Sequence, residues 1–148
     1  MKISIQQEDF DVTHETQLLR DAHSNIGAIV TFSGLVRDLD ESRKILSLTL
    51  EHYPGMTETS LGKIITEAKA RWSILDATVI HRIGELMAEE QIVFVAVASL
   101  HRQDAFSACE FIMDYLKTRA PFWKKCRDES GESWVEAKET DKEADKRW

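Results

Sequence analysis

Apolar and polar positions along the chain follow two periods, one typical of strands and one typical of helices. Period-two patterns and short apolar runs predict strands over residues 1–5, 26–36, 45–53, 77–83, 92–100 and 133–137. The run over 92–100 is apolar on both faces, which indicates a strand in the middle of its sheet. Apolar residues at i, i+3, i+4 and i+7 predict helices over 57–72 and 103–118, and a shorter one is expected over 14–23.

Turn and cap signals set the expected ends of these elements. Thr13 and Thr57 are predicted to cap the first two helices, and Pro121 prevents the third helix from continuing past about Thr118. Pro121 also implies an extended course through Phe122 and Trp123. Loops are expected over 38–44 and 84–91, and a charged tail follows residue 137. The pattern predicts a mixed α/β or α+β fold and leaves its topology open.

Composition narrows the class of protein. The chain has 148 residues, 43% of them hydrophobic and 30% charged, and it contains neither a repeat nor a Pro/Gly/Ser-rich linker, so we expect one domain over 1–148. No apolar stretch approaches the ~20 residues of a membrane span, and the start lacks the pattern of a signal peptide. Cys109 and Cys126 stand outside any metal-binding motif, which suggests a reducing compartment and a cytoplasmic protein.

Charge is distributed unevenly along the chain. The net charge of −7 argues against nucleic acid and against an anionic membrane as partners. The segment 117–127 nevertheless contains five cations and no acid: Lys117, Arg119, Lys124, Lys125 and Arg127. Such a run is usually solvated surface, and a cation near a helix C-terminus is an ordinary partner of the helix dipole. The interleaved Phe122 and Trp123 favour the alternative, a pocket for a planar, anionic small molecule, in which a lysine among cations has a lowered pKa.

Other candidate groups follow strand ends. His101 and Arg102 come directly after the run 92–100 and stand at the start of the last predicted helix. Backbone N–H groups at a helix start can bind an anion, so the two side chains are candidate anion ligands. It is equally consistent with the sequence that they form an ordinary pair of surface residues. Arg37 follows another strand, with a weaker signal, and at least one of His81 and Arg82 is expected to pack in the core. The sequence shows neither a phosphate-binding loop nor a nucleophile elbow nor metal-ligand spacing, so we expect no metal site.

Several long motifs, in order along most of the chain, resemble the catalytic (large) subunits of molybdopterin synthase. They are GAIVTFSGLVRD (27–38), LEHYPGMTE (50–58), VIHRIGEL (79–86), SLHRQDAF (99–106), MDYLKTRAPFWKK (113–125) and WVEAK (134–138). The resemblance implies an α/β hammerhead fold with an additional antiparallel β subdomain. It also implies a homodimer that binds a small ubiquitin-like subunit at each end, forming a heterotetramer.

The resemblance further implies a sulfur-transfer reaction. The small subunit would bring a C-terminal Gly-Gly thiocarboxylate, and two sulfurs would pass in turn to cyclic pyranopterin monophosphate, giving the dithiolene of molybdopterin. No resident cofactor is expected, because the partner supplies the sulfur. In this family's pattern the catalytic lysines match Lys117 and Lys124, and the substrate-binding positions match Arg37, His101, Arg102 and Lys125, together with Cys126 and Lys138.

Two of these positions depart from the family's pattern. Lys138 stands where the family usually has an arginine from the neighbouring protomer, and a lysine binds phosphate as a point charge. Cys126 stands where the family more often has Glu; its cationic neighbours favour partial ionisation of the thiol, and we interpret it as incidental. Two alternative functions remain. The first is a non-catalytic module whose basic segment binds an acidic protein tail. The second is a nucleotide-binding enzyme, although the sequence contains no phosphate-binding loop to support it.

Overall fold

The computed structural model describes residues 1–40, 43–136 and 138–148. Within them the elements run in the order β1 (Lys2–Gln6), α1 (Val12–Ala22), β2 (Ala28–Leu35), β3 (Leu39–Asp40), β4 (Arg43–His52), α2 (Met56–Arg71), β5 (Ile74–Arg82), β6 (Gly84–Met87), β7 (Gln91–Ser99), α3 (Arg102–Arg119), β8 (Phe122–Asp128), β9 (Gly131–Val135) and α4 (Glu139–Asp145). The expected mixed α+β class is confirmed, and no described helix is long and apolar enough to cross a bilayer.

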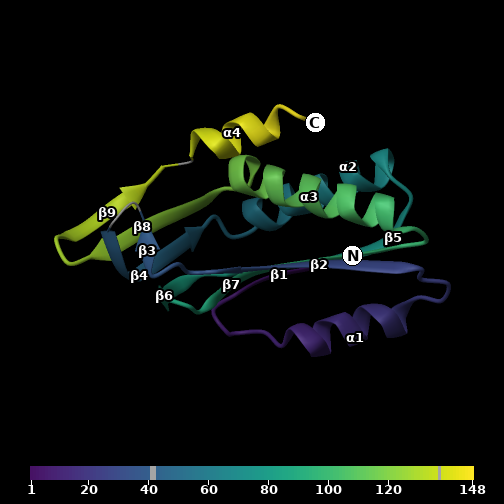
Figure 1. Ribbon diagram of the computed structural model, residues 1–148, viewed down its shortest axis with the longest axis horizontal. Coiled ribbons are helices and arrows are strands. Elements are labelled where there is room, and N and C mark those ends of the chain that lie inside the picture. Colours follow the sequence, from purple (N-terminus) through teal and green to yellow (C-terminus); the bar gives the residue numbers. More distant parts are fainter. Residues whose placement is uncertain (41–42, 137) are drawn as a thin grey trace.

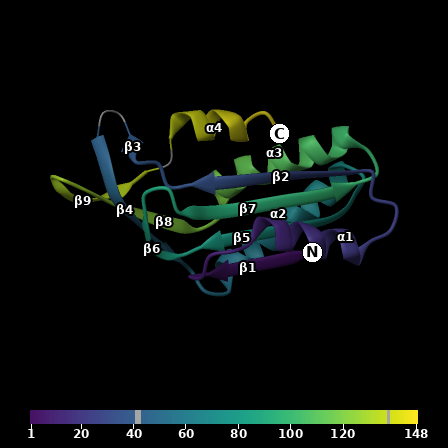
Figure 2. The ribbon, with the colours of Figure 1, turned by 60° about the horizontal axis from the view of Figure 1, so that its bottom comes forward.

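The described strands form two sheets that lie side by side (Figures 1 and 2). The first has the order β1-β5-β7-β2, with β1 parallel to β5 and the other pairs antiparallel. The second is antiparallel throughout: β4 pairs with β3, β6 and β8, and β8 pairs with β9. The additional antiparallel β subdomain implied by the resemblance is therefore present.

The strand β7 lies in the centre of the first sheet and is buried on both faces, as its apolar sequence predicts. Its residues Val93, Val95 and Val97 belong to the larger core cluster, under α2 and α3. Phe94, Ala96 and Ala98 belong to a smaller cluster on the opposite face, which α1 covers (Figure 1). The chain thus places α2 and α3 on one face of the sheet and α1 on the other.

Both predicted helix caps are wrong. The side chain of Asp11 caps α1 by accepting from the backbone N–H of His14, at 3.1 Å. The N-cap of α2 is Gly55, whose positive φ of 83° suits glycine, and Glu58 accepts from its N–H at 2.6 Å. Thr57 is instead buried. Its hydroxyl accepts from the N–H of Tyr53 and donates to the carbonyl of Pro121, which joins the start of α2 to the start of β8.

Three expected irregular segments contain regular structure. The predicted loop 84–91 contains β6, and the predicted loop 38–44 contains β3 and the start of β4, while its residues 41 and 42 lie outside the described part of the chain. The charged tail contains α4, and the extended course through Phe122 and Trp123 continues as the strand β8 to Asp128. The strand predicted over 133–137 is β9, which ends at Val135; residue 137 also lies outside the described part.

Candidate active site

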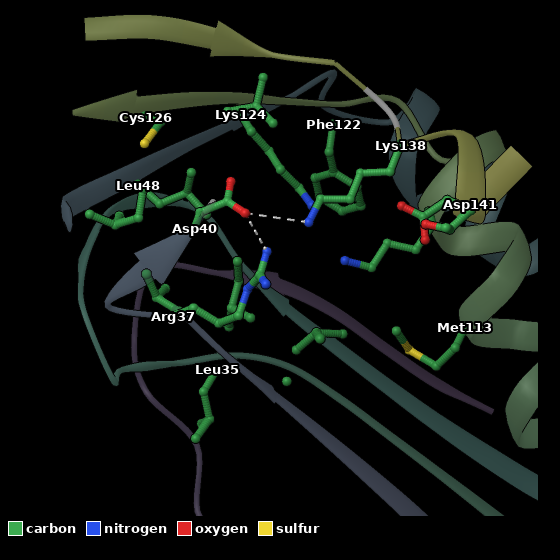
Figure 3. A pocket seen from close by; sticks show the side chains of 18 of the residues that line it. Leu35, Arg37, Asp40, Leu48, Met113, Phe122, Lys124, Cys126, Lys138 and Asp141 are labelled. Atoms are coloured by element: carbon green, nitrogen blue, oxygen red, sulfur yellow. Dashed lines mark hydrogen bonds and ion pairs between the residues drawn. The ribbon is translucent and has the colours of Figure 1, made fainter. Parts of the chain in front are cut away.

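A pocket of about 700 Å³ lies where the two sheets and the C-terminal end of α3 meet (Figure 3). Its walls come from the end of β2, the strands β4, β7, β8 and β9, the last turns of α3 and the start of α4. A pocket of this size holds a small organic ligand. The predicted site residues that line it are Arg37, Lys117, Lys124, Cys126 and Lys138. Sequence motifs far apart in the chain therefore converge on one site.

The amines of Lys117 and Lys124 lie close enough in the pocket for their charges to interact. Lys117 lies on the last turns of α3, and Lys124 lies on β8 after the break at Pro121. Burial, together with the neighbouring charge and amine of Lys117, lowers the pKa of Lys124 to about 8. Among the described residues, neither lysine forms an ion pair with a carboxylate. The prediction of a lysine with a lowered pKa is confirmed at Lys124.

The other three cations of the basic segment have acidic partners elsewhere in the fold. Arg119 pairs with Asp145 at 3.2 Å and lies over the ring of Tyr115, and Arg127 approaches Glu85 at 4.0 Å. Lys125 pairs with Glu132 at 3.4 Å and lies over the ring of Trp134. Of the five cations in this run, Lys117 and Lys124 line the pocket without a carboxylate partner in the described part of the chain, and the other three are paired outside it.

Lys125, expected to bind substrate, does not line this pocket in the single chain. Neighbouring residues of a strand point to opposite faces, so Lys124 and Cys126 share the pocket face of β8 while Lys125 points away. The expectation of a partly ionised Cys126 is also wrong, because burial raises the pKa of its thiol despite the nearby charge of Arg43. Cys126 thus lines the pocket as a neutral, buried thiol.

An aromatic wall stands beside the two lysines. Phe122 lines the pocket, and the buried imidazole of His81 stacks on its ring with centroids 3.8 Å apart and planes inclined by 18°. Burial lowers the pKa of His81 to about 3, and the charges of Lys124 and Lys117 act in the same direction. Both His81 and Arg82 are buried, so the expected packing role is confirmed. The ring of Phe122 gives a flat ligand an apolar surface, and the uncharged imidazole of His81 packs against that ring.

The pocket also contains a set of ion pairs around Asp40 that the sequence analysis did not predict. Asp40 pairs with Arg37 at 3.0 Å, with Lys138 at 3.7 Å and with Arg43 at 3.8 Å (Figure 3). Arg43 is also bound to Asp128 at 3.2 Å. Asp40 and Arg43 fall in a segment expected to be an irregular loop, so their sequence context gave no sign of the pocket.

The structure places His101 and Arg102 far from the two lysines. They border a separate hollow at the start of α3, together with Gly27, Leu100, Gln103, Phe106 and Ser107. Lys117 lies near the opposite end of this 18-residue helix, which is about 27 Å long. Within one chain, His101 and Arg102 therefore do not share a site with Lys117 and Lys124, although one common site was expected.

The donor groups in the pocket suit an anion better than a metal ion. No cluster of three or more His, Cys, Asp or Glu side chains with metal-site geometry occurs in the ranges 1–40, 43–136 and 138–148. The pocket instead combines ammonium and guanidinium groups with the aromatic side chains of Phe32 and Phe122. The fold and the site together define an α+β protein with a cationic pocket that contains two lysines.

Comparison with known proteins assigns this chain to a family. The family model described as MoaE protein matches residues 5–119. The molybdopterin synthase catalytic subunit of Escherichia coli (strain K12) is 52% identical over 147 residues, which cover 99% of this chain and 97% of that protein. The chain therefore belongs to the MoaE family. It is an enzyme that transfers sulfur in molybdenum cofactor biosynthesis, as molybdopterin synthase catalytic subunits do.

Solved structures have the same fold. The molybdopterin biosynthesis MoaE protein from Burkholderia ambifaria superposes with a TM-score of 0.86 at 51% identity, covering 99% of this chain and 97% of that one. A more distant structure, the complex of subunits 1 and 2 of molybdopterin-converting factor from Helicobacter pylori, gives a TM-score of 0.75 at 20% identity and covers 90% of each chain. The second likeness concerns the fold alone.

Proposed function

We propose that the pocket transfers sulfur from the thiocarboxylated C-terminus of a small ubiquitin-like subunit to cyclic pyranopterin monophosphate. The observation that carries this proposal is the pair Lys117 and Lys124, two adjacent amines without carboxylate partners among the described residues, beside the ring of Phe122. A flat pterin with one phosphate matches that combination of ring and cations. The relatives of this chain are named as catalytic subunits, which supports a second subunit as its partner.

The lysines divide the chemistry between them. In each transfer the thiocarboxylate sulfur forms a bond to a carbon of the substrate, and the oxygen on that carbon leaves with its electron pair, as a phosphate oxygen or as water. The bond between the acyl carbon and sulfur then breaks, and the acyl group passes to water directly or through Lys117, which restores a carboxylate on the donor. Lys117 moves the protons or holds the acyl group, and the ammonium of Lys124 stabilises the oxyanions that develop. The donor supplies the sulfur, so we propose that the enzyme needs no resident cofactor.

We propose that the active form is a homodimer, with a small subunit at each end to give a heterotetramer. In one chain, His101 and Arg102 form an anion-competent group that lies the length of α3 away from the lysines. In a dimer, the second copy can bring this group to the pocket. Cys109 and Cys126 are free thiols, which is compatible with the reducing cytoplasm where we place the enzyme.

Complementation between inactive variants tests the shared site. Lys117→Ala and Arg102→Ala are each expected to lose activity. Mixed after dissociation and reassociation, they should recover about a quarter of the wild-type activity, because half of the dimers then contain one intact site. Recovery that stays at zero would mean that each chain builds its site alone.

Direct conversion tests the activity itself. The purified chain is mixed with cyclic pyranopterin monophosphate and thiocarboxylated small subunit, and molybdopterin is measured as its fluorescent oxidised derivative. We expect product that requires all three components. Binding of the small subunit without product would favour the docking-module alternative.

A further inference from the structure

Asp40 occupies the position of an anion within the cationic pocket. Its carboxylate lies 3.0 Å from a guanidinium nitrogen of Arg37, 3.7 Å from the amine of Lys138 and 3.8 Å from a guanidinium nitrogen of Arg43. Figure 3 shows the side chains of Arg37 and Lys138 both reaching this one carboxylate. Two of these three cations belong to positions where the resemblance implies contact with the substrate's anionic groups.

We propose that Asp40 is an internal counterion that competes with the phosphate of the substrate and so sets the affinity of the pocket for anions. This inference rests on the proposed function. Without Asp40, Arg37, Lys138 and Arg43 would repel one another and the two catalytic lysines. With Asp40 in place, an incoming phosphate must take over the contacts to Arg37 and Lys138. The cyclic phosphate of the substrate carries one negative charge shared by two free oxygens, so it can replace the carboxylate at both cations.

The surroundings of Asp40 favour this exchange over a purely structural role. Arg37 has 62% of its side chain exposed and Lys138 has 49%, so both cations can turn from the carboxylate to a ligand. Arg43 keeps a second partner, since its Nε lies 3.2 Å from Asp128. Asp128 itself accepts from the backbone N–H and hydroxyl of Ser130, at 2.8 and 2.7 Å. Arg43 therefore stays anchored when Asp40 releases the other two cations.

Two other carboxylates line the pocket, those of Asp141 and Glu136, and neither forms an ion pair among the described residues. Asp141 raises the pKa of Lys124 through its charge. Asp40 is therefore the carboxylate of this pocket whose position a bound phosphate would share.

The variant Asp40→Asn tests the counterion. Inorganic phosphate is the first probe, and its Kd is measured by calorimetry at two salt concentrations. We expect Asp40→Asn to lower that Kd by roughly threefold to tenfold and to make binding more dependent on salt. The KM for cyclic pyranopterin monophosphate should fall in the same direction, with a smaller change in kcat. Asp38→Asn is the matched control, because it removes the same charge from an exposed position two residues away.

Each outcome of this experiment decides the proposal. An unchanged or raised Kd in Asp40→Asn, with normal unfolding, overturns it and makes Asp40 a residue that positions the cations. Asp40→Ala serves as a second variant, since it also removes the carboxylate but leaves no amide to bond the cations. If wild-type protein yields no molybdopterin while Asp40→Asn still binds phosphate more tightly, the proposed reaction fails and the counterion stands.

Discussion

The imidazole of His81 lies almost flat against the ring of Phe122, with their centroids 3.8 Å apart. The Nδ1 of His81 lies 2.8 Å from the carbonyl oxygen of Arg82, so the neutral ring donates there and its orientation is fixed. Phe122 in turn faces the pocket that contains Lys117 and Lys124. The core of the first sheet thus supports the aromatic wall of the active site through a histidine that stays uncharged.

This histidine makes the fold sensitive to acid. Its pKa is about 3 in the folded protein and about 6.5 in the unfolded chain, so the unfolded state takes up the proton first as the pH falls. The titration of His81 leaves the free energy of unfolding almost unchanged above about pH 6.5 and lowers it between about pH 6.5 and 3. From pH 7 to pH 5 this group should cost about 2 kcal/mol.

The variant His81→Phe keeps an aromatic ring against Phe122 and removes the titration. Urea unfolding at pH 7 and pH 5 should show a smaller loss of stability for this variant than for the wild type. The exposed His14 provides the control, and His14→Asn should behave as the wild type does. Equal pH dependence in His81→Phe and wild type would contradict the assignment.

The rate should decrease at alkaline pH. The pKa of Lys124 is about 8, below its ordinary value of 10.5, and the proposed role requires the ammonium form. The rate of sulfur transfer should therefore fall as the pH rises through about 8. A rate that rises through the same range would mean that Lys124 acts as a neutral base.

Asp141→Asn provides a finer test of the same group. The carboxylate of Asp141 raises the pKa of Lys124, so removing its charge should move the decrease in rate to lower pH. Glu139→Gln is the control, since it neutralises an exposed carboxylate on the same helix, α4, with 81% of its side chain accessible. A pH profile that shifts equally in both variants would show a general charge effect.

Trp148 fixes the C-terminal segment on the helices. Its ring makes edge contacts with Trp72 and Phe111 at 5.4 and 5.7 Å between centroids, and its indole N–H donates to Asp114 at 2.7 Å. Trp148→Ala should lower the free energy of unfolding in urea by about 1–3 kcal/mol. Trp134→Ala, at a position that is 57% exposed, should cost less than about 1 kcal/mol. Similar losses in the two variants would disprove the anchoring role.

The sequence predicted those parts of the fold that depend on local pattern. The buried stripes of α2 and α3 and the doubly buried β7 follow from apolar spacing, and the structure has them within a few residues of the expected bounds. The helix α4 was not predicted because it has no buried face of its own; it is tied to α3 by Asp145, which bonds Thr118 and Arg119. The strand β6 is short, and its pairing with β4 is set by the fold.

In the site, too, residues within local motifs could be predicted, whereas contacts between distant parts of the chain could not. Lys117, Lys124 and Arg37 were found because the residues around them form motifs, and the three line one pocket. The direction of Lys125 depends on the register of β8, which could not be read from a run of cations. The ion pairs of Asp40 join residues 37, 40, 43 and 138, so their geometry depends on the pairing of distant strands.

The central claim is that Lys117 carries out sulfur transfer in this pocket. The most direct measurement compares the wild type with Lys117→Ala in single-turnover conversion of cyclic pyranopterin monophosphate by the thiocarboxylated small subunit. Lys63→Ala serves as the control, because Lys63 is an exposed lysine of α2 outside the pocket. We predict that Lys117→Ala binds the small subunit almost as tightly as the wild type and yields no molybdopterin, while Lys63→Ala is fully active. Wild-type rates from Lys117→Ala would contradict the account.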